Sequence, residues 1–226
     1  MESTVILETR NVSKVYHQGG IQVNAVDGVS LELSKSSVLL IMGPSGSGKT
    51  TLLSMMGCIL HPSGGSVAVE SQNVSALHED RLPDIRKKYF GFVFQAFNLF
   101  PSLTAIENVE VILRLKNWAK ETRKKTALSL LDSVGLAKRA NFYPKDLSGG
   151  EKQRVAFARA LAGDPPIILA DEPTANLDSK TGKEVLALLK ELAEAHGKAI
   201  AIVSHDPKAE ELAHNVVFIE DGRIKT

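Results

Sequence analysis

The stretch Gly43-Pro44-Ser45-Gly46-Ser47-Gly48-Lys49-Thr50 decides how this chain folds. It follows the apolar run Val38–Met42, which predicts a buried strand, and it precedes Thr51-Leu52-Leu53, which favours a helix. The order of strand, glycine-rich loop and helix, with the spacing GxxxxGK followed by Thr, is typical of a loop that binds phosphate. The glycines let backbone N–H groups converge on one point, and the helix adds its positive dipole end. We therefore predict that this segment holds the phosphates of a nucleotide.

Two side chains of this loop carry its specific chemistry. Lys49 supplies a mobile positive charge to the terminal phosphates, and the hydroxyl of Thr50 is placed to ligate Mg²⁺. A flexible Gly/Ser loop is the alternative interpretation, but it explains neither the complete match nor the flanking strand and helix. The guanine-reading motif NKxD is absent from the sequence, so a GTPase is not favoured. The residues of this segment that we expect to contact the nucleotide are Gly43, Ser45, Gly46, Ser47, Gly48, Lys49, Thr50 and Thr51.

Length and composition narrow the class of protein. The chain has 226 residues, 43% of them hydrophobic, and a formal net charge of +1. That length predicts a single domain, residues 1–226, with room for a subdomain. A net charge near zero argues against a dedicated nucleic-acid binder, which needs surplus Lys and Arg to neutralise phosphates. The single cysteine, Cys58, excludes an intrachain disulfide, and the sequence shows neither a membrane-spanning run nor a secretory signal, so we expect a soluble cytoplasmic chain.

The pattern of apolar residues predicts an α/β protein. Its longest apolar runs are typical of strands covered on both faces, and hence of a mostly parallel core sheet flanked by helices. These runs are Val38–Met42, Pro165–Ala170 and Ala199–Val203. Residues 1–35 alternate apolar and polar positions and residues 64–69 are typical of a hairpin arm, so we expect an antiparallel β subdomain. Residues from about 97 to 160 carry mostly helical patterns and predict a helical subdomain.

Leu147-Ser148-Gly149-Gly150-Glu151 opens one of these helical runs. Ser148 and Glu151 form a capping box, which marks the start of a helix. The two glycines leave the first N–H groups of this helix uncovered, which predicts a second anion site with Ser148 and Gly150 as its contacts. A plain cap is the alternative, although Gly-Gly costs backbone entropy that a plain cap does not need. Because there are two such helix starts and one Lys-bearing loop, we expect one nucleotide to lie between the loop of one chain and the Ser148 helix of another.

Two acidic residues, Asp171 and Glu172, directly follow the predicted strand Ile167–Ala170. Ligand chemistry in open α/β sheets takes place at the carboxyl ends of strands. Successive residues that leave a strand point in different directions, so Asp171 can face a metal while Glu172 faces the terminal phosphate. We expect Asp171 to hold Mg²⁺ and Glu172 to orient or deprotonate the attacking water. An isolated acid pair is more often a solvated turn, but this pair follows a buried strand in a chain that has a phosphate loop.

Two further polar residues follow predicted strands. His205 comes after the run Ala199–Val203, and we expect it to donate to the γ-phosphate; a structural histidine is the alternative. Gln95 follows the apolar segment Phe90–Phe94, and we expect its amide to complete the shell of Mg²⁺ and water. Apolar residues after Gln95 form either packing of the helical subdomain or a docking surface, namely Phe97, Leu99 and Phe100.

Together these motifs resemble the nucleotide-binding domain of ABC transporters over essentially the whole chain. By this resemblance the Walker A loop is Gly43–Thr50, the Q-loop centres on Gln95, and the signature is Leu147–Glu151. Walker B is Ile167–Asp171, the D-loop is Ala175–Asp178, and the switch histidine is His205. Tyr16 falls where the family has the aromatic residue that stacks on adenine; an ordinary strand residue is the alternative. The resemblance implies a P-loop NTPase that binds ATP and Mg²⁺ and hydrolyses ATP, with Glu172 as catalytic base and Gln95 and His205 in the same site.

The same resemblance implies that two copies enclose two ATP molecules and drive a separate integral membrane permease subunit at the cytoplasmic face of the cell membrane. The segments around Tyr16 and Gln95 and residues 102–109 look like the LolD, MacB and DevA branch, which serves lipoprotein release, macrolide or peptide export, or glycolipid export. No fused membrane region is visible, so a split arrangement is expected. The alternative, an ABC-type ATPase of DNA repair or translation, predicts a long coiled coil between Gln95 and Ser148, two cassettes or a basic face, and the sequence shows none of these.

Overall fold

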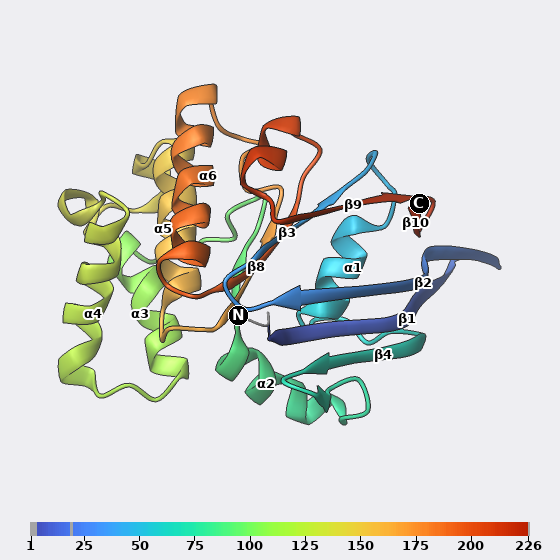
Figure 1. Ribbon diagram of the computed structural model, residues 1–226. Helices are drawn as coiled ribbons and strands as arrows, with labels where there is room; N and C mark the ends of the chain where they lie inside the picture. Colours follow the sequence, from blue (N-terminus) through green and yellow to red (C-terminus); the bar gives the residue numbers. More distant parts are fainter. Residues whose placement is uncertain (1–3, 19, 226) are drawn as a thin grey trace.

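A six-stranded sheet forms the centre of the computed structural model, which describes residues 4–18 and 20–225 (Figure 1). Its strands are β3 (Val38–Met42), β6 (Phe90–Val93), β7 (Ile167–Asp171), β8 (Ala199–Val203), β9 (Asn215–Glu220) and β10 (Arg223–Lys225). They lie in the order β10-β9-β3-β8-β7-β6, and every neighbouring pair is parallel except β9 and β10. The predicted α/β fold with a mostly parallel core is confirmed.

The central strands are covered on both faces, as their unbroken apolar sequences predict. All five residues of β3 and of β8 are buried. Because side chains alternate along a strand, β3 contributes to two separate apolar clusters. Leu40 packs in one cluster with residues of α5 (Gly149–Leu161) and α6 (Ser179–Glu194), and Leu39 packs in the other with residues of α1 (Lys49–Met56). The sheet is therefore the middle layer between two groups of helices.

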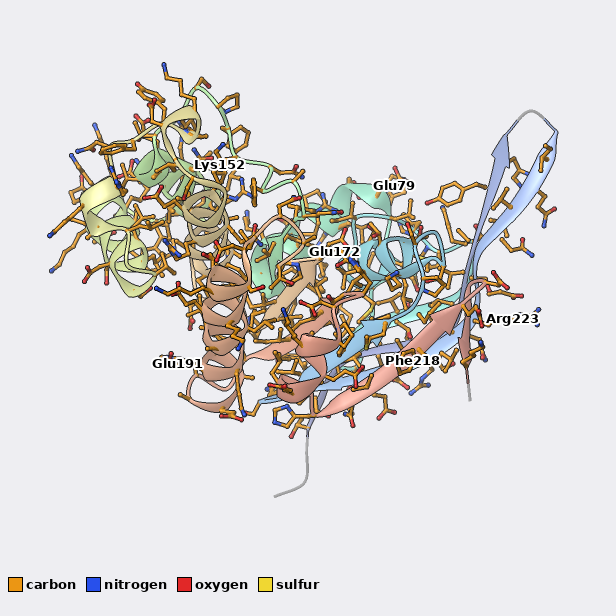
Figure 2. All side chains as sticks on the ribbon, turned by 90° about the horizontal axis from the view of Figure 1, so that it is seen from above. Glu79, Lys152, Glu172, Glu191, Phe218 and Arg223 are labelled. Atoms are coloured by element: carbon orange, nitrogen blue, oxygen red, sulfur yellow. The ribbon has the colours of Figure 1, made fainter. Side chains whose placement is uncertain are left out.

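A second, antiparallel sheet lies beside this core. Its strands are β1 (Val5–Gln18), β2 (Ile21–Ser34), β4 (Gly64–Val69) and β5 (Gln72–Asn73). They lie in the order β2-β1-β4-β5, and β1 and β2 form a long ribbon that projects from one side of the molecule (Figure 2). The predicted antiparallel β subdomain is confirmed, except that the part of this prediction on residues 1–3 and 19 lies outside the described residues.

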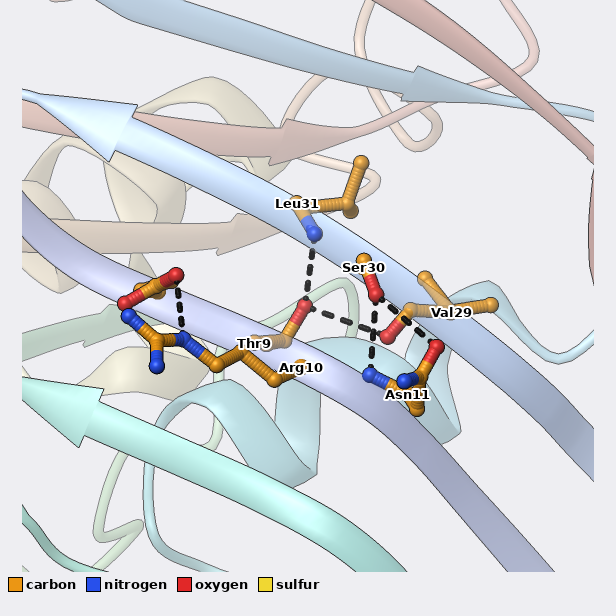
Figure 3. Close-up of polar contacts among 7 residues, drawn as sticks. Thr9, Arg10, Asn11, Val29, Ser30 and Leu31 are labelled. Carbon is orange, nitrogen blue, oxygen red and sulfur yellow. Dashed lines mark hydrogen bonds and ion pairs between the residues drawn. The ribbon is translucent and has the colours of Figure 1, made fainter.

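The ladder between β1 and β2 is interrupted after Thr9, and side chains supply the missing backbone partners there (Figure 3). The hydroxyl of Thr9 accepts a hydrogen bond from the backbone N–H of Leu31 at 2.9 Å and donates to the carbonyl of Val29 at 3.4 Å. The backbone N–H of Asn11, a residue with φ 47°, donates to the hydroxyl of Ser30 at 2.8 Å. A bulge of this kind increases the local twist of a ribbon, and here the hydroxyls of Thr9 and Ser30 accept the bonds of the Leu31 and Asn11 N–H groups.

Three helices occupy most of residues 97–160: α3 (Ala105–Leu115), α4 (Lys120–Ser133) and α5 (Figure 1). Thr104 forms a capping box at the start of α3, and Gly135, with φ 73°, follows the end of α4. Apolar residues of all three helices belong to the cluster that also covers one face of the parallel sheet. Their division from the core as a subdomain stays a prediction.

The remaining helices each lie between two strands in the chain. The spacing of the apolar residues from Val185 to Leu192 is explained by α6, which is 16 residues long and begins at the capping side chain of Asp178. Among the residues that the structure describes, no helix is both long and apolar enough to cross a bilayer. The other helical segments are α2 (Leu82–Tyr89) and the 3-10 turns Glu79–Arg81, Ala137–Arg139, Pro144–Asp146 and Pro207–Leu212.

Candidate nucleotide site at the strand ends

The glycine-rich loop between β3 and α1 is held against the antiparallel sheet. Gly48 has φ 97°, and a Cβ atom there would lie 2.0 Å from the carbonyl oxygen of Ala25 in β2. Any other residue would need a left-handed backbone and would collide with β2, so this position requires glycine. Lys49, the first residue of α1, donates from Nζ to the carbonyls of Gly43 and Pro44, both at 2.8 Å. The loop therefore curls around the amine of Lys49 at the start of α1.

Among the described residues, the loop also holds polar groups that are free to bind a ligand. Ser47 is only 4% exposed, and its hydroxyl has no hydrogen-bond partner among the described residues. A buried hydroxyl left unpaired costs about 1–3 kcal/mol. The first N–H groups of α1 likewise have no acceptor within the helix. A phosphate group carries several acceptor oxygens and is the kind of ligand that satisfies both.

Thr50 and Asp171 meet in the structure although 121 positions separate them in the sequence. The hydroxyl of Thr50, in α1, donates to Oδ1 of Asp171, the last residue of β7, at 3.1 Å. Burial raises the pKa of Asp171, while the hydrogen bond from Thr50 acts to lower it. A hydroxyl and a carboxylate are hard oxygen donors of the kind that Mg²⁺ takes from proteins.

Glu172 and His205 form a second pair, at the ends of β7 and β8. Nδ1 of His205 lies 2.8 Å from Oε1 of Glu172. The Glu172 side chain is 12% exposed and that of His205 is 66% exposed. Glu172, near the centre of the molecule in Figure 2, has φ 46°, which is uncommon outside Gly, Asn and Asp. Local strain of about 1–3 kcal/mol at such a residue is typical of functional sites.

A cavity of about 440 Å³ joins this pair to the phosphate loop. Gln95, which follows β6, lines the same cavity, and its backbone carbonyl accepts a hydrogen bond from Nδ2 of Asn176 at 2.8 Å. Groups from the ends of β6, β7 and β8 thus face the loop after β3, as expected at the carboxyl edge of a parallel sheet. Ala25 lines the cavity together with the predicted residues Ser45, Gly46, Gly48, Lys49, Thr50, Thr51, Gln95, Glu172 and His205.

Tyr16 lies outside this cavity, in the β1–β2 ribbon. Its side chain is 42% exposed, it is paired with Val23 across the ribbon, and Nζ of Lys14 is 5.6 Å from the centre of its ring. An exposed ring has a free face for stacking, but the contacts of Tyr16 are those of an ordinary strand residue. Its role toward adenine stays a prediction.

Ser148 and Gly150 begin α5 and do not line the cavity of their own chain. The predicted capping box is present: the N–H of Ser148 donates to Oε2 of Glu151 at 2.9 Å, and the N–H of Glu151 donates to Oγ of Ser148 at 3.2 Å. The bond from the Ser148 backbone lowers the pKa of Glu151. A Cβ atom on Gly150 would lie 2.6 Å from Cγ2 of Thr181 in α6. Packing within one chain therefore already explains Gly150, which weakens the argument that Gly-Gly serves an anion alone.

The family follows from comparison with known proteins. A family model for ABC transporters matches residues 26–175 of this chain. The chain belongs to the ABC transporter family. An ABC transporter ATP-binding protein of Thermotoga maritima is 46% identical over 97% of this chain and 94% of its own length. MacB of Hyphomonas neptunium, a macrolide export ATP-binding/permease protein, is 43% identical over 97% of this chain, which spans 34% of MacB.

Solved structures agree with this ABC fold. MJ0796 of Methanocaldococcus jannaschii, an ABC transporter ATP-binding protein, is 44% identical over 97% of this chain and 95% of its own length. Two dimeric structures of the MJ0796 cassette match this chain with a TM-score of 0.93 and cover 98% of it and 97% of their own chains. One of them is a post-hydrolysis state bound to ADP and Pi. The predicted ATP-binding cassette and its ATPase activity are confirmed.

Two contacts of this ABC cassette were not predicted from the sequence. Asn176 lies within the D-loop segment Ala175–Asp178, and its Nδ2 donates to the carbonyl of Gln95. Arg159 of α5 donates to two backbone carbonyls of the loop that follows Gln95. Both contacts join segments far apart in the chain, so spacing gives no sign of them. The one available signal was a charged residue in the otherwise apolar run Val155–Leu161.

Proposed function

We propose that this ABC cassette hydrolyses ATP in the cavity between the phosphate loop and the strand ends, and that a membrane subunit uses the energy. The observation that carries the proposal is the 2.8 Å contact between Glu172 and His205 in a cavity that Lys49 also lines. Lys49 binds the terminal phosphates, and Glu172 orients or deprotonates the attacking water. His205 holds the carboxylate of Glu172 and donates to the γ-phosphate.

The proposed cofactor is Mg²⁺, with Thr50, Asp171 and Gln95 as its protein contacts. A hydroxyl and a carboxylate oxygen 3.1 Å apart, with the amide of Gln95 lining the adjoining cavity, support this fit. Mg²⁺ commonly takes one or two carboxylates and completes its shell with water and substrate phosphates. When bound, it supplies neutralisation of the charge that develops on the phosphates.

Replacing Asp171 with Asn tests this site. We expect the Mg²⁺ concentration for half-maximal ATP hydrolysis to rise by about 10-fold or more, because a neutral amide oxygen is a weaker ligand than a carboxylate. ATPase activity titrated with MgCl₂ measures it. Asp132→Asn, at an exposed position near the end of α4, is the matched control and should titrate like the parent. An unchanged Mg²⁺ requirement in Asp171→Asn would contradict the metal assignment.

A second copy of the chain is the proposed partner at the nucleotide. Ser148 and Gly150 lie outside the cavity of their own chain, so they reach a nucleotide only in the site of another chain. The two dimeric structures of the MJ0796 cassette, 43% identical to this chain, support the arrangement. We therefore propose that two chains enclose two ATP molecules, each held by the phosphate loop of one chain and the Ser148 helix of the other.

A separate membrane subunit is the proposed second partner, and an apolar groove of about 510 Å³ supports its docking. The groove is lined by Phe90, Phe92 and Phe94, whose successive ring centres are 5.9 and 5.8 Å apart. Phe94 lines this groove, and the next residue, Gln95, lines the nucleotide cavity. A partner bound in the groove would therefore contact the residue next to one that faces the nucleotide. Three basic and one acidic residue also line it, namely Arg86, Lys87, Lys116 and Asp84. We propose an amphipathic helix with an acidic side chain as the occupant.

The residues after Gln95 divide between packing and docking. Leu99 packs against the apolar cluster that covers the parallel sheet, whereas Phe100 is 48% exposed. The backbone of Phe100 is fixed by Asn108, which accepts from its N–H at 2.8 Å and donates to its carbonyl at 3.2 Å. A change of the Phe100 side chain therefore leaves the fold intact and tests the docking surface alone.

Replacing Phe100 with Asp is expected to weaken binding of the membrane subunit by about 10-fold or more, as the loss of an aromatic anchor does at interfaces. The measurement is the amount of the cassette retained by the detergent-solubilised membrane subunit. Phe218→Asp is the control, because Phe218 is also 48% exposed but lies on β9. That strand is near the edge of the sheet opposite β6, the strand that leads to Gln95 and Phe100. Equal retention of both variants would contradict docking at Phe100.

Location and cargo follow from the same proposal. We propose that the cassette sits at the cytoplasmic face of the cell membrane through its membrane subunit, and that the transporter exports lipoprotein, macrolide, peptide or glycolipid. The 43% identity with a macrolide export protein supports the export class. The alternative in DNA repair or translation is less well supported, because α3 and α4 between Gln95 and Ser148 are only 11 and 14 residues long.

A further inference from the structure

Arg159 is a buried charge with an unusual set of partners. It lies in α5, is 7% exposed, and donates to two backbone carbonyls: Nη1 to that of Asn98 at 2.5 Å and Nη2 to that of Phe97 at 2.7 Å. Burial lowers the pKa of the guanidinium. Charged side chains are seldom buried unless a group of opposite charge compensates them. Among the described residues no carboxylate pairs with Arg159, so its two carbonyl contacts are the feature to explain.

The segment that Arg159 holds has a strained backbone. Phe97 has φ 61° and Asn98 has φ 48°. The N–H of Asn98 donates to the carbonyl of Ala96 at 2.6 Å, which closes a three-residue turn around Phe97. Three-residue turns with a positive φ at the centre are rare and strained, and a bulky residue in this region is an outlier. The turn directs two consecutive carbonyls at α5, where the two terminal nitrogens of a planar guanidinium bind one carbonyl each in a fixed geometry.

The same segment leads to the nucleotide cavity. Gln95, two residues before Phe97, lines the cavity, and Asn176 binds its carbonyl at 2.8 Å. The loop is therefore fixed at one end by Asn176 and at the other by Arg159. Arg159 is about 16 Å along α5 from Ser148, at 1.5 Å per residue. One rigid helix thus connects the start of α5 to the loop that carries Gln95.

We infer that Arg159 is a positioning residue that ties the Gln95 loop to α5, so that the Gln95 amide is held in the cavity only while α5 keeps the loop in its left-handed turn. Arg159 itself does not touch ATP. The inference rests on the proposed role of Gln95 in the shell of metal and water. It gives the buried charge a use in the ATPase reaction, because the two guanidinium bonds add to the bonds within the loop in holding its strained backbone.

The first test replaces Arg159 with Lys, which keeps the charge and removes the fork. We expect kcat for ATP hydrolysis to fall by about 10-fold, as for other groups that orient a metal site, with an unchanged KM for ATP. Hydrogen exchange of the backbone N–H groups of residues 97–100 should become faster. Arg154→Lys is the matched control, because Arg154 lies on the same helix and pairs with Glu184 of α6 at 3.5 Å. A variant of Arg159 with parental kcat and parental exchange would overturn the inference.

The second test asks whether the clamp acts through the strained turn. Glycine adopts positive φ freely, so Asn98→Gly should make the turn less dependent on Arg159. In the Asn98→Gly background we expect Arg159→Lys to lower kcat by less than about 3-fold, because contacting residues are coupled and the glycine replaces part of what the clamp supplies. Equal losses in both backgrounds would overturn the inference. If Arg159→Lys alone does not fold, folding replaces kcat as the measurement. A double variant Arg159→Lys/Asn98→Gly that folds supports the clamp, and a double variant that does not fold overturns it.

Failure of this inference is distinguishable from failure of the proposed function. Suppose that Asp171→Asn and Glu172→Gln change hydrolysis as expected, but Arg159→Lys lowers kcat equally with and without Asn98→Gly. Then only the clamp is wrong. If Gln95→Ala hydrolyses ATP with the kcat and Mg²⁺ requirement of the parent, the role of Gln95 on which the clamp depends is wrong.

Discussion

Replacing Glu172 with Gln is expected to lower kcat for ATP hydrolysis by about 10²–10⁴-fold while ATP binding is retained, because the amide keeps the shape of the side chain and removes the base. The amide oxygen can still contact Nδ1 of His205, which lies 2.8 Å from Glu172 in the parent. The phosphate loop and Lys49 are unchanged by the substitution. The bound ATP should therefore persist, and with it the dimer that the nucleotide holds together.

Two measurements check this expectation. Steady-state release of phosphate gives kcat, and light scattering with saturating Mg²⁺ and ATP gives the mass of the complex. Glu194→Gln is the matched control, since Glu194 is exposed at the end of α6 and pairs with Lys190 at 3.8 Å. It should hydrolyse ATP like the parent. A Glu172→Gln chain that keeps more than a tenth of the parental kcat, or that stays monomeric where ATP is bound, would contradict the role of Glu172.

The features that could be predicted from the sequence are those fixed by neighbouring residues. The unbroken apolar run of β3 indicates burial on both faces, and the residues after the loop, Thr51-Leu52-Leu53, favour the helix that the structure has there. Ser148 and Glu151 predict the start of α5 correctly, because a capping box needs only residues three apart. The meeting of several strand ends in one cavity follows from a parallel sheet without knowledge of the order of its strands.

The features that could not be predicted depend on which segments pack together. A Cβ atom on Gly150 would crowd Thr181, 31 positions later, and nothing near Gly150 in the sequence indicates that neighbour. The left-handed backbone of Glu172 arises at the junction of β7 with the next segment, where a glycine would have been the expected signal. The contact of Arg159 with the loop after Gln95 joins residues 61 and 62 positions apart. Local patterns carry no information on such pairs.

Mixing two inactive variants tests the proposed division of each site between two chains. Lys49→Ala alone should abolish hydrolysis because the terminal phosphates lose their positive charge. Ser148→Arg alone should do so because a bulky side chain fills the start of α5 where the nucleotide of the other chain is expected. The substitution also removes a cap, at about 1 kcal/mol. Ser148→Ala, which loses the cap and the hydroxyl without adding bulk, separates that effect and should lose less activity than Ser148→Arg.

In a mixed dimer of Lys49→Ala and Ser148→Arg, one site carries both defects and the other carries neither. An equal mixture forms mixed dimers in half of the cases, so independent sites should recover about a quarter of the parental activity. The matched control mixes Lys49→Ala with Glu172→Gln, where each site keeps one defect, because Lys49 and Glu172 line the cavity of the same chain. That mixture should stay inactive.

The outcome also depends on whether the two sites act together. If hydrolysis needs both sites, the first mixture stays inactive. The isolated mixed dimer should still retain one ATP at its intact site, because binding there needs only the unaltered loop of one chain and the unaltered Ser148 helix of the other. If Ser148 lay within its own chain's site, each site of the first mixed dimer would carry one defect, so that dimer would be inactive and would retain no ATP. That result, or full parental activity at dilutions where light scattering detects monomers alone, would contradict the shared arrangement.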